Sequence, residues 1–560
     1  MTQAEERKTV EERIGLSIDS FVRSLERNRL SILTIFLYVV TVALIRDLSE
    51  YFLLDQEFVT TAHPWIFSIA HHVSFFIVIF LGLVLLLSAF TQRGVRKVTN
   101  YICVFWWIII LPPWMDHFIG GLNHNYEYFS PTDFIDALVH FSGKGFHIGQ
   151  ATEVMVVLFA IFAYGIWTQR RNLGTVGGRV LTGVRVFFLV VFTLLTMFIM
   201  ATPALFLPVG SVGGVPVFPA FDLTKYHEYP LFLVMYYLLM GIALVIAIVY
   251  IAKRDRFMDI LRSMRLPQTM FFAVIVAAGI VTGWKYSCGL YLVTDILQTP
   301  FYVNLSFAVI SIVSAVIVWQ VGTMWNDISD RKMDEPGQGR RTVASGLFPT
   351  RPYLEFSLVL VIVSLIMAAL LSVQQFLVMV VILALAWFYS FKPVRLKENV
   401  LSPLLMGLGA FLVLIYGALT PYSQILFFEG DPPIPYLTGN VIVPTLGPEA
   451  YLLGVFIFLG LVIGSMIMDI EGYDEDRRAR VRTIYTSLGL DRGKMLVSAL
   501  IFLASLTPIA IFNDPLDLVL FPLLGASAAF LFWRTGMPRQ VMVVAFLGLV
   551  YAAIRYMGLL

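Results

Sequence analysis

Residues 326–334 read NDISDRKMD and carry three aspartates at positions i, i+3 and i+7. This spacing places Asp327, Asp330 and Asp334 on one face of a helix that continues an apolar run. Three like charges on one face repel, and the arrangement is more favourable when a cation lies among them. Mg²⁺ takes carboxylate oxygens together with substrate phosphates, and Asn326 adds a neutral oxygen donor beside them. The stretch therefore predicts a site for magnesium and phosphate.

A second acidic stretch, MIMDIEGYDED at 466–476, also follows an apolar run. Asp469 and Asp476 are seven residues apart and are expected on one helical face, with Asp474 nearby and Gly472 between them. Carboxylates that hold metal ions, together with bases that hold phosphate oxygens, suit a diphosphate whose charge the metals neutralise as it leaves. The neighbouring bases are Arg340, Arg341, Lys392, Arg395, Lys397, Arg477 and Arg478.

A simpler interpretation competes with this one, because charged residues just outside a membrane span are often only solvated loop ends. One acidic cluster alone would fit that interpretation. Two clusters at the same side, each accompanied by bases, favour a site. Asp255 and Asp259 show why care is needed: they also read DxxxD, but they lie among five bases at 253–265. We predict for them a solvated helix at the lipid surface.

The chain that positions these residues has 560 residues, 58% of them hydrophobic and 14% charged, with a mean hydropathy of +0.82. A soluble protein does not sustain that balance, so we expect an all-α, polytopic integral membrane protein. Apolar windows predict about fifteen transmembrane helices. The expected starts lie near residues 30, 65, 101, 148, 182, 230, 268, 303, 354, 374, 401, 450, 494, 516 and 539. With a formal net charge of +2 and no block of like charge, no nucleic-acid partner is expected.

Basic connections alternate with connections that are poor in Lys and Arg. The basic ones lie at 91–97, 168–179, 253–265, 391–397 and 474–482. By the positive-inside rule, the N-terminus, the basic connections and both acidic stretches face the cytoplasm, and we expect the cytoplasmic (plasma) membrane.

The strongest cytoplasmic break divides the chain into two modules. We expect a cytoplasmic amphipathic segment at 1–29, a six-helix, His-rich membrane module at 30–252, a basic cytoplasmic linker at 253–267 and a second module at 268–560. All eight histidines fall before the linker, which suggests that the two modules differ in chemistry.

The second module resembles the UbiA superfamily of intramembrane prenyltransferases from about residue 265 to 560. NDISDRKMD matches the family's first motif, NDxxDxxxD, in full, and DEPGQGRRTVASG resembles the family's segment downstream of that motif. AWFYSFKPVRLK (386–397) resembles the end of the family's fourth span, and RTIYTSLGLDRGKM (482–495) resembles the segment downstream of its second motif. That second motif is usually DxxxD. Here Asp476 takes its second position and Gly472 its first, so Asp469 and Asp474 remain alternatives.

The resemblance implies a nine-helix bundle and Mg²⁺-dependent transfer of an isoprenoid from a prenyl diphosphate to a hydrophobic acceptor among the membrane lipids. It implies catalytic roles for Asp327, Asp330, Asp476 and Tyr389. The diphosphate would be bound by Asn326, Arg341, Lys392, Arg395 and Lys397. Two Mg²⁺ ions would be held by Asn326, Asp327, Asp330 and Asp334 and by Asp469, Asp474 and Asp476.

Two alternative functions remain open. A terpene cyclase would use the same site chemistry, with an internal double bond as the nucleophile. A transporter or lipid-binding protein would instead use the acids to bind cations, and it would carry ionisable residues midway through its spans. Most acids here lie near span ends, and Glu153 and Lys285 are among the few ambiguous residues.

The histidines of the first module cluster near the outer ends of its spans. Neutral imidazoles suit transition metals, so a second metal site is one interpretation; haem binding, proton handling and ordinary buried polar residues are the others. The candidate ligands are His63, His71, His72, His117, His140 and His147. The stretch 120–147 is predicted to form an outer cap with short helices.

Overall fold

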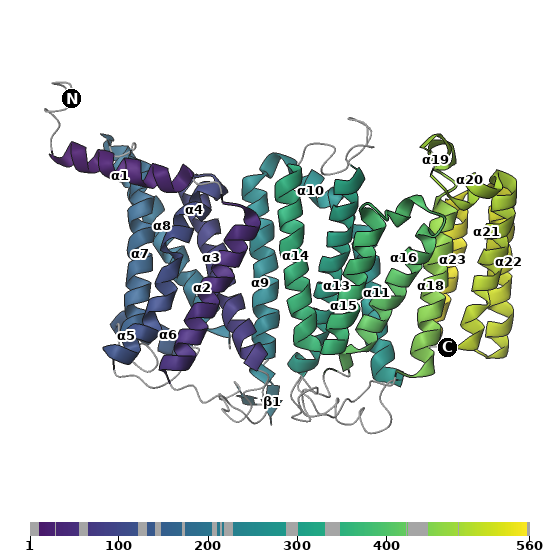
Figure 1. Cartoon of the computed structure of the whole chain (residues 1–560). Helices are drawn as coiled ribbons and strands as arrows, with labels where there is room; N and C mark the ends of the chain where they lie inside the picture. Colours follow the sequence, from purple (N-terminus) through teal and green to yellow (C-terminus); the bar gives the residue numbers. More distant parts are fainter. Residues whose placement is uncertain are drawn as a thin grey trace. The chain divides into compact units, whose positions relative to one another are not determined.

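The structure is a computed structural model, and its described part is helical apart from one short hairpin (Figure 1). It describes residues 10–27, 30–54, 65–120, 131–140, 147–170, 174–203, 210–212, 215–217, 228–286, 301–330, 348–421, 423, 446–479 and 481–556. The chain divides into two compact units, Met1–Asp259 and Ile260–Leu560, and the division falls inside the segment predicted as a linker.

The N-terminal unit contains six helices that are long and apolar enough to cross a membrane, all within its described residues. Its helices are α1 (Val10–Arg27), α2 (Ile32–Leu53), α3 (Trp65–Thr91), α4 (Val95–Phe105), η1 (Trp106–Ile110), α5 (Leu111–Phe118), α6 (Pro131–His140), α7 (Ile148–Gln169), α8 (Val176–Ala201), α9 (Glu228–Ala252) and η5 (Arg254–Arg256). The strands β1 (Gly210–Val212) and β2 (Val215–Val217) pair antiparallel. The short helix α6 lies in the stretch predicted to be a cap.

Helix α1 is the amphipathic segment expected near the N-terminus, and it lies across the ends of the spans of its unit (Figure 1). Polar contacts hold it there. The indole Nε1 of Trp167 donates to Asp19 at 2.7 Å, and Arg170 pairs with the same carboxylate. The Tyr164 hydroxyl donates to Glu26 at 3.1 Å. The helix is therefore fixed to α7 by its polar face.

The C-terminal unit contains eight helices of spanning length and one shorter apolar helix among its described residues. Its helices are α10 (Phe257–Ser263), which begins just before the division, α11 (Leu266–Tyr286), α13 (Phe301–Asp330), α14 (Thr350–Leu371), α15 (Val373–Ser390), η6 (Leu396–Glu398), α16 (Ser402–Ala418), α18 (Pro448–Met468), α19 (Tyr473–Ala479), α20 (Ile484–Leu488), α21 (Leu490–Ser505), η8 (Thr507–Ala510), α22 (Pro515–Thr535) and α23 (Pro538–Tyr556).

The membrane class and the all-α fold are thus confirmed, with fourteen candidate spans in the described part of the chain. The shorter helix α16, at 17 residues, stands where another of the fifteen expected spans was placed. The nine-helix bundle remains a prediction. In η5 and α10, which carry Asp255 and Asp259, no residue is buried, as expected for a solvated helix.

Local sequence explains where several spans begin and end. Ser372 alone separates α14 from α15, and its side chain accepts a hydrogen bond from the Gln375 N–H at 3.1 Å, which starts the second helix. Helix α22 begins with Pro515, whose missing N–H costs nothing at that position. It ends at Gly536, whose φ of 62° suits a residue without a side chain.

Helices α11 and α16 approach so closely that their contact admits only glycine. A Cβ built on Gly279 would lie 2.2 Å from the Leu414 carbonyl oxygen, and one on Gly417 would lie 2.3 Å from that of Val276. Small residues let membrane helices pack backbone to backbone in this way. Helix α11 is followed in sequence by α13, which carries the first acidic motif, and it packs against α13 as well.

We predict that Gly279→Ala destabilises the protein by about 1–3 kcal/mol, because the added methyl group meets backbone atoms that cannot move aside. Gly409→Ala on α16 is the matched control, since nothing lies within 4 Å of its Cβ position. Thermal unfolding of both variants in detergent measures the effect. Equal melting temperatures would contradict the close approach.

Candidate active site

The first acidic motif occupies the last turns of α13, where Asp327 and Asp330 are only 3% and 9% exposed. Bases meet both carboxylates. Arg265 donates to Asp327 at 3.0 Å, and Arg395 donates to Asp330 at 3.0 Å. Lys397 also pairs with Asp330. Buried charge is stable only when it is paired and hydrogen-bonded, and these contacts provide that pairing.

Lys397 ties the polar face of α13 together. Its ammonium group donates to Asn326 Oδ1 and to the Ser329 hydroxyl, each at 2.9 Å, as well as to Asp330. Three oxygens of one helical end thus converge on a single cation. A site that gathers carboxylate, amide and hydroxyl oxygens in this way has the donor set that hard cations prefer.

Arg265 and Arg395, which bind the two carboxylates, both have left-handed backbone, with φ of 49° and 36°. Non-glycine residues adopt this region at a cost, which the surroundings must offset. The backbone around Arg265 is supported by Gln320, whose side-chain amide donates to the Met264 carbonyl at 3.0 Å and to the Thr269 hydroxyl at 2.7 Å. These two hydrogen bonds fix the backbone on both sides of Arg265.

The second acidic stretch does not form one continuous helix. Helix α18 ends at Met468 and α19 begins at Tyr473, so the prediction that Asp469 and Asp476 share one helical face is wrong. Gly472, whose carbonyl accepts from the Asp476 N–H at 2.8 Å, lies in the turn between them. The turn nevertheless keeps the two carboxyl groups together: burial, and then the Asp476 carboxylate, raise the pKa of Asp469 to about 7. Asp474 is exposed.

One acid of each stretch lies within electrostatic range of Tyr389. Its hydroxyl is hydrogen-bonded to Ser402 and lies within electrostatic range of Asp330 and Asp469. The loops that follow the stretches also meet, because the Arg482 N–H donates to the Glu398 carbonyl at 3.3 Å and Glu398 pairs with Arg395. Residues about 140 positions apart in the sequence thus lie around one tyrosine.

In the described part of the chain, no contact supports the role of the remaining predicted diphosphate and metal ligands. Lys392 is exposed and has no ion-pair partner among the residues that the structure describes. Asp334 and Arg341 lie outside the described residues. Trp325, at the level of the motif, is 5% exposed and donates through Nε1 to the Ser357 hydroxyl, so it acts as a packing residue.

Sequence reasoning missed several residues of this site, above all Arg265. It was placed in the basic linker, 62 residues before its partner Asp327. The available signal was its position directly before a span, on the side predicted to carry the acidic stretches. Ser329 and Glu398 were missed as well, and nothing in their sequence context singles them out.

The donor set fits Mg²⁺. Asp469 is a half-buried carboxyl that faces Asp476 and has no basic partner within the described part of the chain. Two neighbouring carboxylates repel unless a cation lies between them. The described acids do not, however, form a group of three around one point, and Asp334, the third acid of the first motif, lies outside the described residues.

The predicted metal site of the N-terminal unit is not supported. Its described histidines have separate partners: His72 bonds Asp47 at 2.6 Å, His140 pairs with Asp136, and His147 caps α7. The rings of His71 and His72 are tilted by 48° with their centroids 4.0 Å apart, and His117 packs edge-on against Phe118. No group of three His, Cys, Asp or Glu suited to a metal occurs among the described residues, and His63 lies outside them.

Fold and site together define a polytopic membrane protein with an oxygen-rich, base-lined centre at the ends of its spans. Residues 291–545 match the model of the UbiA prenyltransferase family, so the predicted resemblance of this part of the chain to that family is confirmed.

Two relatives resemble this part of the chain. Digeranylgeranylglyceryl phosphate synthase of Saccharolobus solfataricus is 22% identical over 37% of this chain and 66% of its own length. The bacteriochlorophyll synthase 33 kDa chain of Rhodobacter capsulatus is 24% identical over 45% of this chain and 79% of its own length.

Solved structures of the same family also resemble it. A structure of digeranylgeranylglyceryl phosphate synthase is 15% identical, covers 54% of this chain and 99% of its own, and has a TM-score of 0.39. A UbiA homologue from Archaeoglobus fulgidus bound to DMAPP and Mg²⁺ is 14% identical, covers 52% of this chain and 96% of its own, and has a TM-score of 0.35.

We predict that Asp330→Ala destabilises the protein by about 3 kcal/mol, because it leaves Arg395 and Lys397 as poorly solvated charges without their carboxylate. Asp474→Ala is the control: an exposed side chain is expected to change stability by less than about 0.5 kcal/mol. Denaturant or thermal unfolding in detergent measures both. The ion-pair account fails if the two variants are equally stable.

Proposed function

We propose that the C-terminal unit catalyses Mg²⁺-dependent transfer of an isoprenoid chain from a prenyl diphosphate to a lipid-soluble acceptor within the membrane. One observation carries the proposal: Tyr389 lies within electrostatic range of both acidic stretches, and Arg395 and Lys397 lie on the acids of the first. Acids for metal ions and bases for phosphate oxygens are thereby gathered where the spans end, next to the apolar interior that suits a prenyl tail.

The two stretches take separate roles in this proposal. Asn326, Asp327 and Asp330 would hold one metal ion, together with Asp334. Asp469 and Asp476 would hold the second; we prefer Asp469 to Asp474 here because Asp474 is exposed, whereas Asp469 is half-buried beside Asp476. Bound Mg²⁺ supplies the positive charge that stabilises the departing diphosphate.

The bases complete the diphosphate site. Arg395 and Lys397, which pair with Asp330, would donate to phosphate oxygens of the diphosphate, because guanidinium and ammonium groups bind phosphate as well as carboxylate. Arg265 would do the same beside Asp327, and Arg341 and Lys392 are assigned the same role by the family resemblance. Tyr389 lines the floor of the pocket and orients the reacting end. The allylic carbon gains cationic character as its C–O bond breaks and the diphosphate leaves with the bonding electrons. The acceptor then forms a bond to that carbon and loses a proton.

The acceptor is proposed only as a hydrophobic molecule, because the two relatives carry names that point to different products. The alternation of basic connections supports a cytoplasmic N-terminus, acidic stretches at the cytoplasmic face and a place in the cytoplasmic membrane.

We predict that purified protein transfers label from radiolabelled geranyl or geranylgeranyl diphosphate to extracted membrane lipids, and that EDTA stops the reaction. Asp327→Ala and Asp330→Ala each lower the rate by about 100-fold or more, since they remove charge stabilisation of the leaving group. Asp255→Ala, in the exposed DxxxD of the linker, retains full activity. Undiminished activity in the two site variants would refute the assignment, and release of a cyclic hydrocarbon without acceptor would identify a cyclase.

We also predict that Mg²⁺ binding strengthens as the pH rises from 6 to 8. A carboxyl with its pKa raised to about 7 is protonated below that pH, and the proton competes with the metal. Because one proton is lost, the affinity for Mg²⁺ rises by at most about tenfold per pH unit below pH 7. Calorimetric titration with Mg²⁺ at a fixed pyrophosphate concentration measures this affinity. The dependence disappears in Asp469→Asn and persists in Asp474→Asn; the reverse pattern would assign the second metal to Asp474.

A further inference from the structure

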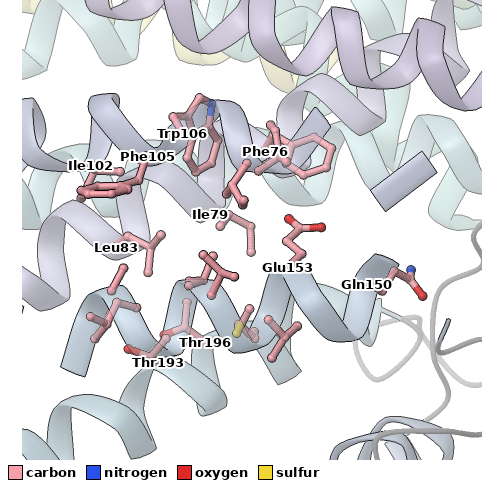
Figure 2. Close-up of a pocket in the computed structure, with 18 of the residues that line it drawn as sticks. Phe76, Ile79, Leu83, Ile102, Phe105, Trp106, Gln150, Glu153, Thr193 and Thr196 are labelled. Atoms are coloured by element: carbon pink, nitrogen blue, oxygen red, sulfur yellow. The ribbon is translucent and has the colours of Figure 1, made fainter. Parts of the chain in front are cut away.

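The N-terminal unit contains a cavity of about 190 Å³ between α2, α3, α4, α7 and α8 (Figure 2). Its walls are mainly aliphatic, and the aromatic side chains of Phe75, Phe76, Phe105 and Trp106 are among them. An engineered apolar cavity of about 150 Å³ binds benzene. The space is therefore sufficient for one six-membered ring with a short substituent, and the aromatic side chains offer such a ring edge-to-face contacts.

Most polar groups of the lining already have partners in the protein. The hydroxyls of Thr193 and Thr196 donate to carbonyls of their own helix, at 2.8 Å each, so they do not need a partner in the cavity. The Gln150 carbonyl oxygen accepts from the His147 N–H at 3.3 Å. Arg46 pairs with Glu50 at 2.7 Å and lies over the ring of Phe76.

Glu153 differs from these groups. It lies on α7, inside the span Ile148–Gln169, and its carboxyl points toward Phe76 and Ile79 across the cavity (Figure 2). Within the described residues no hydrogen bond or ion pair involves this carboxyl. A polar group without a partner in an apolar enclosure is costly, and an ionisable residue inside a span marks a functional site by default.

The charge around the cavity selects the kind of ligand. Among the described residues, Glu153 lies within electrostatic range of two acids, Glu50 and Asp116, and of one base, Arg46. Acids therefore outnumber bases at this end, and an anionic head group is repelled. A neutral group that donates a hydrogen bond satisfies the Glu153 carboxyl without bringing further charge into the membrane interior.

We propose that this cavity binds a lipid-soluble phenol, whose ring fills the apolar enclosure and whose hydroxyl donates a hydrogen bond to Glu153. The site belongs to the N-terminal unit alone and does not depend on prenyl transfer by the C-terminal unit. No metal ion takes part in it.

Three ligands that share an ethyl-substituted benzene ring and differ in the group opposite the ethyl chain test the proposal on the full-length wild-type chain. Equilibrium dialysis of protein in lipid nanodiscs, with empty nanodiscs as the partition control, compares 4-ethylphenol, ethylbenzene and 4-ethylbenzoate. We expect saturable binding of one 4-ethylphenol per chain, ethylbenzene about tenfold weaker because it lacks the hydrogen bond, and no specific binding of 4-ethylbenzoate. Equal partition of 4-ethylphenol into filled and empty nanodiscs, or preferred binding of the benzoate, would overturn the proposal.

Variants locate the binding site. Glu153→Leu is expected to weaken the binding of 4-ethylphenol to the affinity of ethylbenzene. Ala160→Phe, which fills the cavity, is expected to abolish the binding of both ligands. Met155→Leu is the matched control on the same helix, since Met155 is exposed and does not line the cavity. Unchanged 4-ethylphenol affinity in a folded Glu153→Leu protein contradicts the assignment. The comparison of ligands needs no variant, so it decides the question even where a substitution prevents folding.

Discussion

The pairing of buried carboxylates with bases at the ends of the spans is the constraint on which the C-terminal unit depends. Asp327 and Asp330 are almost fully enclosed, and charge in that position is unstable without a partner. Arg265, Arg395 and Lys397 come from two different segments of the chain to supply it. Closing these ion pairs therefore also draws together the start of α11, the end of α13 and the loop after α15.

The same pairing suits a reaction that moves negative charge. Under the proposed function, arginine and lysine that already balance carboxylates would turn to phosphate oxygens when metal ions and diphosphate bind, so that these charges would stay paired. The second stretch is built differently. Burial, and then the neighbouring Asp476 carboxylate, raise the pKa of Asp469, which has no basic partner among the described residues. A cation between the two carboxyl groups would relieve their repulsion.

Much of the fold could be predicted from the sequence because membrane spans are local features. Long apolar runs and alternating basic connections located the spans to within a few residues in most cases, and α16 was placed correctly although it is short. The first motif was also local, since i, i+3, i+7 spacing on a continuing helix brings Asp327 and Asp330 to one face.

The break between α18 and α19 could not be predicted in this way, because helical spacing does not reveal where a turn intervenes. Arg265 was missed because its contact with Asp327 depends on how α11 packs against α13. The cavity beside Glu153 likewise depends on side chains from several helices.

Electron paramagnetic resonance of bound Mn²⁺ tests the central claim, that two acidic stretches converge on one ligand, most directly. With inorganic pyrophosphate present, the account predicts two Mn²⁺ ions per chain with a spin–spin coupling between them, and the loss of one ion in Asp469→Ala. One isolated ion per chain, or two ions without coupling, would contradict it, because the stretches would then bind metal separately rather than share a diphosphate.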